Sequence, residues 1–190
     1  MVGVEGVGAA GLPQGPLELP RHGDPSLAIW QMLESITDPE IPVLSLREIG
    51  VLRAIRQTKQ ASWQVFITPT YIGCPALSQM AKDLQDRLQT EGIHAEVITS
   101  HAPAWSSDWI SASGLDKLRQ YGIAPPGRSA TEPSFQTMSR MANPKIREDV
   151  PCPRCGSALT TEISRFGSTA CKALYRCLAC REPFEYFKPF

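Results

Sequence analysis

The chain has 190 residues, 42% of them hydrophobic, and its 19 basic side chains equal its 19 acidic ones. This composition is ordinary for a globular protein and excludes wholesale disorder. No apolar run reaches the roughly 18 residues of a membrane-spanning helix. The first twenty residues contain no Lys or Arg to begin a secretory signal, so we expect a cytoplasmic protein with no membrane partner.

The balanced charge conceals two oppositely charged parts. Residues 1–139 carry 10 basic and 14 acidic side chains, a net charge of −4, whereas residues 140–190 carry 9 and 5, a net charge of +4. Four thiolates holding one divalent metal in the second part would halve its positive charge. A surface that binds nucleic acid needs many more cations, so we expect no nucleic-acid partner.

Residues 1–24 are rich in Gly and Pro and have no helical or strand periodicity. We interpret them as a disordered arm that contributes nothing to the core. Asp24 and Pro25 then suit the N-cap and first position of a helix, which apolar residues at helical spacing extend to about residue 37. Two prolines in 38–42 forbid a helix there and hold two carboxylates on a rigid loop.

Alternating polar and apolar residues predict two strands, 51–58 and 62–68, joined as a hairpin. A helix is expected over about 75–90, where apolar residues recur at helical spacing, and a strand over 93–99 follows it. A strand, a helix and a strand in this order favour a right-handed parallel unit. The sequence thus predicts an α/β (α+β) two-layer domain with a small mixed sheet over residues 25–126.

The end of this domain is an aromatic extension that contains Trp105 and Trp109 and a helical segment near 108–121. Aromatic residues four apart are more often part of a core than a stacking surface, so we expect both rings to be buried. Residues 127–150 are polar and without periodicity. We interpret them as a linker to a separate module over residues 151–190.

Two Cys-x-x-Cys pairs, Cys152 with Cys155 and Cys177 with Cys180, dominate this second module. Thiols stay reduced in the cytoplasm, so metal binding is favoured over disulfides. Four thiolates satisfy tetrahedral Zn²⁺ and leave no open position, which predicts a structural zinc β-ribbon. An iron-bound, rubredoxin-like site remains an alternative, as do redox dithiols or plain reduced cysteines.

Two further features of the module are less specific. Cys171 lacks a paired cysteine, and we place it outside the metal shell, with its role open. The last nine residues, 182–190, hold three Phe and one Tyr. We expect these rings to cover the thin core of the ribbon, with an exposed docking patch as the alternative.

Cys74 is the candidate reactive thiol, because it directly precedes the predicted helix that begins near residue 75. Free N–H groups and the helix dipole at that position stabilise a thiolate. Thr68 and Thr70 lie on the same loop, and Asp38 and Glu40 offer oxygen ligands or a base if the two loops meet. The alternative is that Cys74 is a small buried hydrophobe and the acidic loop a simple turn.

Three motifs in residues 27–100 resemble the MIP18 family, also called DUF59. They are Asp38-Pro-Glu-Ile-Pro-Val43, the Leu-x-x-Ile-Gly-Val of 46–51, and Thr68-Pro-Thr-x-x-x-Cys74-Pro75. The resemblance implies a MIP18-like fold and a role in iron–sulfur cluster assembly or delivery. It also implies that Cys74 handles iron or a cluster transiently, with Asp38, Glu40, Thr68 and Thr70 as its neighbours. Leu52 and Arg53 depart from the aliphatic continuation usual in the family, which leaves the strand start open.

The rest of the chain is similar to the PaaD family, also called PaaJ, of bacterial phenylacetyl-CoA epoxidase subunits. The similarity rests on Pro103-Ala-Trp-Ser-Ser-Asp-Trp109, Gly122-Ile-Ala-Pro-Pro126, Cys152-Pro-x-Cys-Gly-Ser157 and Ser164-x-Phe-Gly-Ser-Thr-x-Cys-Lys-Ala-Leu-Tyr-Arg-Cys177. It implies an accessory subunit of the multicomponent di-iron ring 1,2-epoxidase of aerobic phenylacetate catabolism. Its partners would be the oxygenase, the reductase or both, and the chain would not be catalytic by itself.

These features support two main hypotheses for the role of the chain. The first is iron or iron–sulfur cluster delivery through Cys74 to the oxygenase or its reductase. The second is a purely structural docking subunit without thiol chemistry. A standalone thiol enzyme is disfavoured, because no base is identifiable by its spacing from Cys74.

Overall fold

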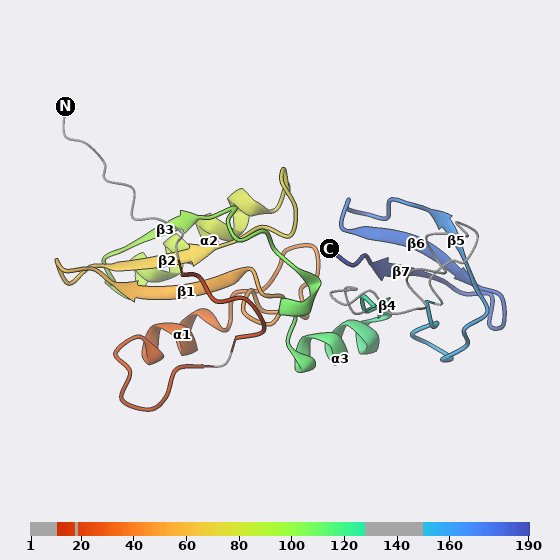
Figure 1. Ribbon diagram of the computed structural model, residues 1–190, viewed down its shortest axis with the longest axis horizontal. Helices are drawn as coiled ribbons and strands as arrows, with labels where there is room; N and C mark the ends of the chain where they lie inside the picture. Colours follow the sequence, from red (N-terminus) through yellow and green to blue (C-terminus); the bar gives the residue numbers. More distant parts are fainter. Residues whose placement is uncertain (1–10, 18, 128–149) are drawn as a thin grey trace.

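The first of two small sheets is mixed, as expected from the sequence. The computed structural model describes residues 11–17, 19–127 and 150–190 (Figure 1). Strand β1 (Leu52–Gln57) runs antiparallel to β2 (Trp63–Ile67), and β2 runs parallel to β3 (Ala95–Thr99), in the order β1-β2-β3. The predicted hairpin and the parallel strand–helix–strand unit are both confirmed.

Two helices pack on one face of this sheet. Helix α2 (Leu77–Thr90) buries Met80, Leu84 and Leu88, which lie at intervals of four residues on one face of the helix. They join one hydrophobic core with Val65 of β2 and with helix α1 (Leu27–Leu33). This is the expected two-layer α/β arrangement.

Helix α1 is shorter than the sequence predicts at both ends. Asp24 Oδ1 accepts hydrogen bonds from the N–H and hydroxyl of Ser26, at 2.8 and 2.6 Å, so it closes a turn before the helix and Ser26 is the N-cap. At the other end the Ile36 N–H bonds to the Leu33 carbonyl at 3.0 Å, which tightens the last turn. Thr37 then forms an isolated bridge with Ser45.

The opposite face of the sheet is covered by residues 11–15. We expected this part of the arm to contribute nothing to the core, and that is wrong: Leu12 is 5% exposed and packs with Ala54 and Phe66. The Arg53 guanidinium donates to the carbonyls of Pro13 and Gly15. Successive residues of a strand face opposite sides, so this second apolar face needs a cover that helices do not supply.

The unusual Leu52-Arg53 pair lies at the start of β1. Leu52 is the first strand residue, and the register shifts between Leu52 and Ala54, which forms a bulge at Arg53. The bulge turns Arg53 toward Trp109, whose ring centre lies 3.9 Å from the guanidinium carbon. Burial lowers the pKa of Arg53 to about 10.

Trp105 and Trp109 are buried as expected, at 6% and 5% exposure. The short 3₁₀ helix η1 (Ser107–Trp109) presses against Gly50, where a Cβ atom would meet the Trp109 Cβ at 2.8 Å and φ is +77°. Only glycine fits such a position without strain. Trp105 Nε1 also donates to the Ile49 carbonyl at 3.1 Å, which fixes the extension to the loop before β1.

The second sheet has the order β4-β7-β6-β5. Strands β5 (Thr160–Ser164), β6 (Lys172–Cys177) and β7 (Pro183–Phe187) are antiparallel neighbours. Helix α3 (Ala112–Tyr121) leads directly into β4 (Ile123–Ala124), which pairs parallel to β7. The ribbon sheet therefore includes a strand from the first part of the chain, and α3 lies between the first sheet and the ribbon (Figure 1). All but the ends of the predicted linker lies outside the described residues.

The prediction that the aromatic residues of the tail cover the ribbon core holds for Phe184 and Tyr186 but not for Phe187 or for Phe190, which is 41% exposed. Phe184 and Tyr186 join Tyr175 in the ribbon core, whereas Phe187 is fully buried in the core of the first sheet, with its ring centre 5.9 Å from that of Trp105. Cys171 joins the same core. Both parts of the chain thus contribute side chains to the core of the first sheet.

The described residues include no helix with the length and apolarity to cross a bilayer.

Candidate functional site

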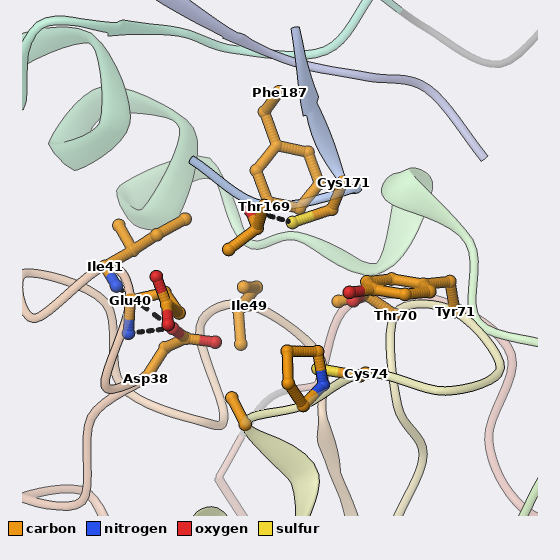
Figure 2. Close-up of a pocket in the computed structure, with 12 residues that line it drawn as sticks. Asp38, Glu40, Ile41, Ile49, Thr70, Tyr71, Cys74, Thr169, Cys171 and Phe187 are labelled. Atoms are coloured by element: carbon orange, nitrogen blue, oxygen red, sulfur yellow. Dashed lines mark hydrogen bonds between the residues drawn. The ribbon is translucent and has the colours of Figure 1, made fainter. Parts of the chain in front are cut away.

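A small pocket lies where three loops converge. The acidic loop contributes Asp38 and Glu40, the loop before α2 contributes Thr70 and Cys74, and the turn before β6 contributes Cys171 (Figure 2). The cavity between them measures about 10 Å³, which is room for about one water molecule. Four of the five predicted residues of the reactive site, Asp38, Glu40, Thr70 and Cys74, thus lie around one cavity.

Cys74 is half-buried, one turn before α2. Burial raises the pKa of its thiol, and the nearby charge of Asp38 raises it further, although hydrogen bonds from the N–H groups of Ala76 and Leu77 and from Thr70 oppose the shift. The sequence predicts that the N–H groups at the helix start favour the thiolate of Cys74. The amides are present, but they are outweighed by desolvation.

Asp38 supplies a buried carboxylate to the pocket. Its Oδ1 accepts from the N–H groups of Glu40 and Ile41 at 2.7 and 3.0 Å, so the predicted acidic turn exists. Its other oxygen points toward the middle of the pocket (Figure 2). Burial raises the pKa of Asp38 despite those two hydrogen bonds. Glu40, by contrast, is exposed at the pocket rim.

Of the two predicted threonines, Thr70 belongs to the pocket and Thr68 does not. Thr70 lines the pocket and is 6% exposed. Thr68 does not line it: the residue is buried at the end of β2, where its N–H donates to the Val51 carbonyl at 2.8 Å. Its hydroxyl has no hydrogen-bond partner among the described residues.

Cys171 is the pocket residue that sequence reasoning missed. It comes from the ribbon, is 9% exposed, and its Sγ lies 3.0 Å from the Thr169 hydroxyl. Burial raises the pKa of Cys171, to which the charges of Asp38 and Cys74 add. Its lack of a Cys-x-x-Cys partner was the one sequence signal of a role outside the ribbon metal site.

The residue after Cys171, Lys172, is a buried cation close to the pocket. Lys172 is 2% exposed, and its Nζ lies 2.8 Å from Oε2 of Glu185 on β7. Its positive charge lowers the pKa values of both Asp38 and Cys171, although burial raises each of them more. The ribbon therefore supplies both a thiol and a favourable electrostatic field.

The four remaining cysteines form a separate cluster. Their sulfurs all lie within 4.8 Å of one another, with 3.8 Å between Cys152 and Cys180 and 3.6 Å between Cys155 and Cys177. Metal–sulfur bonds of about 2.3 Å in a tetrahedron place the sulfurs about 3.8 Å apart. The residues therefore fit a tetrahedral metal ion such as Zn²⁺, and Cys171 lies outside this cluster, as expected.

The ribbon backbone also favours the thiolate of Cys177, whereas burial and the hydrogen bonds with the other ribbon sulfurs raise the pKa of Cys180. The Cys180 N–H donates to Cys177 Sγ at 3.4 Å, and this and other hydrogen bonds lower the pKa of Cys177 to about 6. Amides directed at a metal-binding sulfur stabilise its negative charge. The two groups of candidate metal ligands thus differ. The sulfurs of the four ribbon cysteines lie within 4.8 Å of one another, whereas the thiols and carboxylates of the pocket are more widely spaced.

A di-iron oxygenase centre does not fit the described residues. Such a centre needs paired Glu-x-x-His motifs facing inward from a helix bundle. The Glu-x-x-His formed by Glu91 and His94 follows α2 with both side chains exposed. Within the described residues, the ribbon cysteines are the one group of three or more His, Cys, Asp or Glu with donor atoms that close together.

Comparisons with known proteins agree with both parts of the fold. A family of iron–sulfur cluster assembly proteins matches residues 27–97, and the PaaD zinc beta ribbon domain matches residues 137–188. A protein of Escherichia coli (strain K12), assigned provisionally as one of the subunits of 1,2-phenylacetyl-CoA epoxidase, is 42% identical over 161 residues. That match covers 84% of this chain and 90% of the relative.

A solved structure gives a weaker match. The crystal structure of a DUF59 domain of unknown function from Bacillus anthracis is 24% identical, with a TM-score of 0.44, and the match covers 48% of this chain and 88% of that one. The two sequence resemblances, to DUF59 proteins and to PaaD, are confirmed by the family matches.

Proposed function

Because the chain belongs to the PaaD family of phenylacetyl-CoA epoxidase subunits, we propose that it is an accessory component of that complex. In this role it carries iron or an iron–sulfur cluster to the oxygenase or its reductase. It acts in the cytoplasm and does not catalyse epoxidation itself.

The observation that carries this proposal is the meeting of thiol and carboxylate donors in one pocket. Cys74 and Asp38 come from separate loops, and both line a cavity near the surface. Thiolates and carboxylates are the side chains that bind iron and iron–sulfur clusters. A half-buried donor at the edge of a pocket can exchange its cargo with a partner, which a closed four-cysteine site cannot.

The raised pKa values of Cys74 and Asp38 suit transient binding. A metal ion must displace the thiol proton before it binds, which weakens its affinity at neutral pH. The pocket then releases the metal when a partner offers better ligands. The convergent ribbon cysteines have the opposite character, and we propose that they hold a structural zinc ion permanently.

A structural role in docking, without thiol chemistry, is the second candidate. It is supported by apolar side chains on the ribbon surface, where Leu159 and Leu178 are 66% and 57% exposed. The Leu178 N–H donates to the Leu159 carbonyl at 2.7 Å, so the two residues are adjacent. Neighbouring exposed leucines are typical of a protein-binding patch.

Production of the epoxidase subunits together with variants of this chain separates the two candidates. Cys74→Ala is expected to keep its fold, its zinc and its co-purification with the complex, while the iron content of the oxygenase or the reductase falls several-fold. The matched control is Ser78→Ala, an exposed position in the first turn of α2. Unchanged iron in both partners would refute delivery through Cys74. Loss of co-purification in Leu159→Ser/Leu178→Ser alone would favour the docking role.

A further inference from the structure

The pocket contains two thiols, and they come from different parts of the chain. Cys74 precedes α2 in the first domain, and Cys171 precedes β6 in the ribbon. Both line the same cavity, and the charge of Cys74 raises the pKa of Cys171. In Figure 2 the two sulfurs lie on opposite walls of the cavity.

Asp38 provides a third donor. The residue is 6% exposed, and both hydrogen bonds that the described residues give it end on Oδ1. The other oxygen, Oδ2, faces the cavity (Figure 2). Because it faces the cavity and not a backbone donor, this oxygen is available to accept a proton or to bind a cation.

The size of the cavity limits what can lie between these donors. At about 10 Å³ it holds one water-sized body. A cluster of two irons and two sulfides needs several times that space, whereas one desolvated metal ion does not. The pocket therefore favours a single ion over an assembled cluster.

We propose that Cys74 and Cys171 jointly bind one thiophilic divalent cation, with Asp38 Oδ2 as a third ligand, and that the iron cargo is carried as a single Fe²⁺ ion. This inference rests on the proposed function and narrows its cargo. On binding, the two thiols each lose a proton to solvent and two metal–sulfur bonds form, so the ion and the two thiolates together are neutral.

The spacing of the donors explains why such an ion is cargo and not a permanent cofactor. Among the described residues, no three of these donors approach one another within 4.8 Å, unlike the ribbon cysteines. The ion therefore draws the walls together on binding and still lacks a full tetrahedral shell. An incomplete shell leaves a coordination position that a ligand of the receiving protein can enter.

Cobalt(II) tests the shared site, because cobalt–thiolate bonds absorb light in proportion to their number. Zinc-filled protein, prepared without oxygen, is titrated with Co²⁺ while its zinc content is followed. We expect about one additional Co²⁺ with a thiolate charge-transfer band and no loss of zinc. Cys171→Ser and Cys74→Ser should each reduce the band to about half, since one of two sulfur bonds remains, and the double variant should abolish it. Ser78→Ala serves as the control and should match the wild type.

Two other results of the cobalt titration would overturn the inference that Cys74 and Cys171 bind one ion. A full-strength band in Cys171→Ser, or no band in the wild type, shows that the two thiols do not share an ion. Zinc retention and thermal unfolding identify any variant that fails to fold, and Cys171→Ala and Asp38→Asn then provide second tests. If Cys171→Ser leaves iron delivery intact while Cys74→Ala abolishes it, this inference fails and the proposed function stands. If cobalt binds as expected but neither variant alters partner iron, the proposed function fails.

Discussion

At the scale of single residues, the protonation of Cys74 decides how the pocket works. Burial opposes ionisation of this thiol, and so does the nearby carboxylate of Asp38, although the structure also surrounds it with the amides that a reactive cysteine needs. A cysteine that is neutral until a metal displaces its proton is protected from oxidants and alkylating agents. The pocket is therefore better suited to binding metal than to nucleophilic catalysis.

The rate at which Cys74 is alkylated should follow its raised pKa. We expect slow reaction with iodoacetamide at pH 7 and a rise that continues above the ordinary thiol value of 9.0. Asp38→Asn removes a negative charge that raises this pKa, so it should shift the profile to lower pH. Peptide mass spectrometry of the zinc-filled protein measures the alkylation rate of Cys74 against pH in the wild type and in Asp38→Asn. Reaction at pH 7 as fast as that of a free thiol would contradict the assignment.

Residue types alone could indicate Cys74 and its loop neighbours, but not their surroundings. The motif places Cys74 before a helix, yet the pKa of its thiol depends on its burial and on the charge of Asp38, which lies 36 positions earlier in the chain. Cys171 could not be assigned from its spacing, because its contact with the pocket depends on how the ribbon packs. Long-range packing is what a local pattern does not encode.

At the scale of elements, the periodic segments are the ones that sequence predicts well. Strands β1 and β2 and helix α2 lie within two residues of their predicted bounds, because alternation and helical spacing follow from burial on one face. Strand β4 has only two residues and no period, so no pattern indicates it. The packing of residues 11–17 is equally hidden, since it depends on arginines of β1 for its partners.

Helix α3 is held to the first domain by a buried carboxylate, and this contact predicts a pH-dependent stability. Glu48 accepts hydrogen bonds from the Ser45 N–H, the Ser113 hydroxyl and Lys117 Nζ, the last at 2.8 Å. Burial raises the pKa of Glu48, but the hydrogen bonds from these partners outweigh it and hold the pKa below its ordinary value of 4.5. A carboxyl group whose pKa is lower in the folded than in the unfolded protein stabilises the fold at pH values above its unfolded-state pKa. This stabilisation is lost as the pH falls through the folded-state pKa.

Glu48→Gln should therefore destabilise the protein by about 1–3 kcal/mol at pH 7. The difference from the wild type should shrink as the pH falls below 4.5, because the wild-type carboxyl then becomes protonated as well. Urea unfolding at several pH values measures this. The control is Glu91→Gln, whose exposed pair with Arg87 contributes about 0–1 kcal/mol. A pH-independent difference would show that the charge of Glu48 does not matter.

At the scale of the whole molecule, the ribbon and the first domain act as one body. Strand β4 adds to the ribbon sheet, Phe187 enters the core of the first domain, and Cys171 forms a wall of its pocket. A ribbon metal site that stabilises its own module then also positions Cys171, one of the three proposed iron ligands. If the chain acts as proposed, we expect zinc binding and iron handling to be coupled through this packing.

Phe187→Ala tests the shared core. The side chain is fully buried, so its truncation should cost about 3–5 kcal/mol and should make Cys171 reactive toward alkylating agents. Phe166→Ala is the matched control, because that ring is 65% exposed and its loss should change stability by less than about 0.5 kcal/mol. Thermal unfolding and peptide mapping provide the readouts. Equal effects of the two substitutions would contradict the shared core.

Removal of the ribbon metal should expose the pocket from one side. With a strong chelator the four ribbon cysteines lose the ion that holds them together, and we expect β5 to β7 to unfold locally. Cys171 should then be alkylated together with the ribbon cysteines, and the affinity of the pocket for Co²⁺ should fall at least tenfold. Hydrogen exchange by peptide would follow the unfolding. Protection of Cys171 after complete zinc loss would show that the ribbon stays packed without metal.

Direct transfer of iron tests the central claim, which is that iron passes through the Cys74 pocket to another component of the epoxidase. The zinc-filled chain is loaded anaerobically with ⁵⁷Fe²⁺, mixed with metal-free oxygenase and reductase in the presence of a chelator, and separated before the ⁵⁷Fe in each protein is counted. We predict that one partner acquires iron from the wild-type chain and from Ser78→Ala, and that Cys74→Ala transfers none. Iron uptake at the same rate with and without the chain would contradict the account.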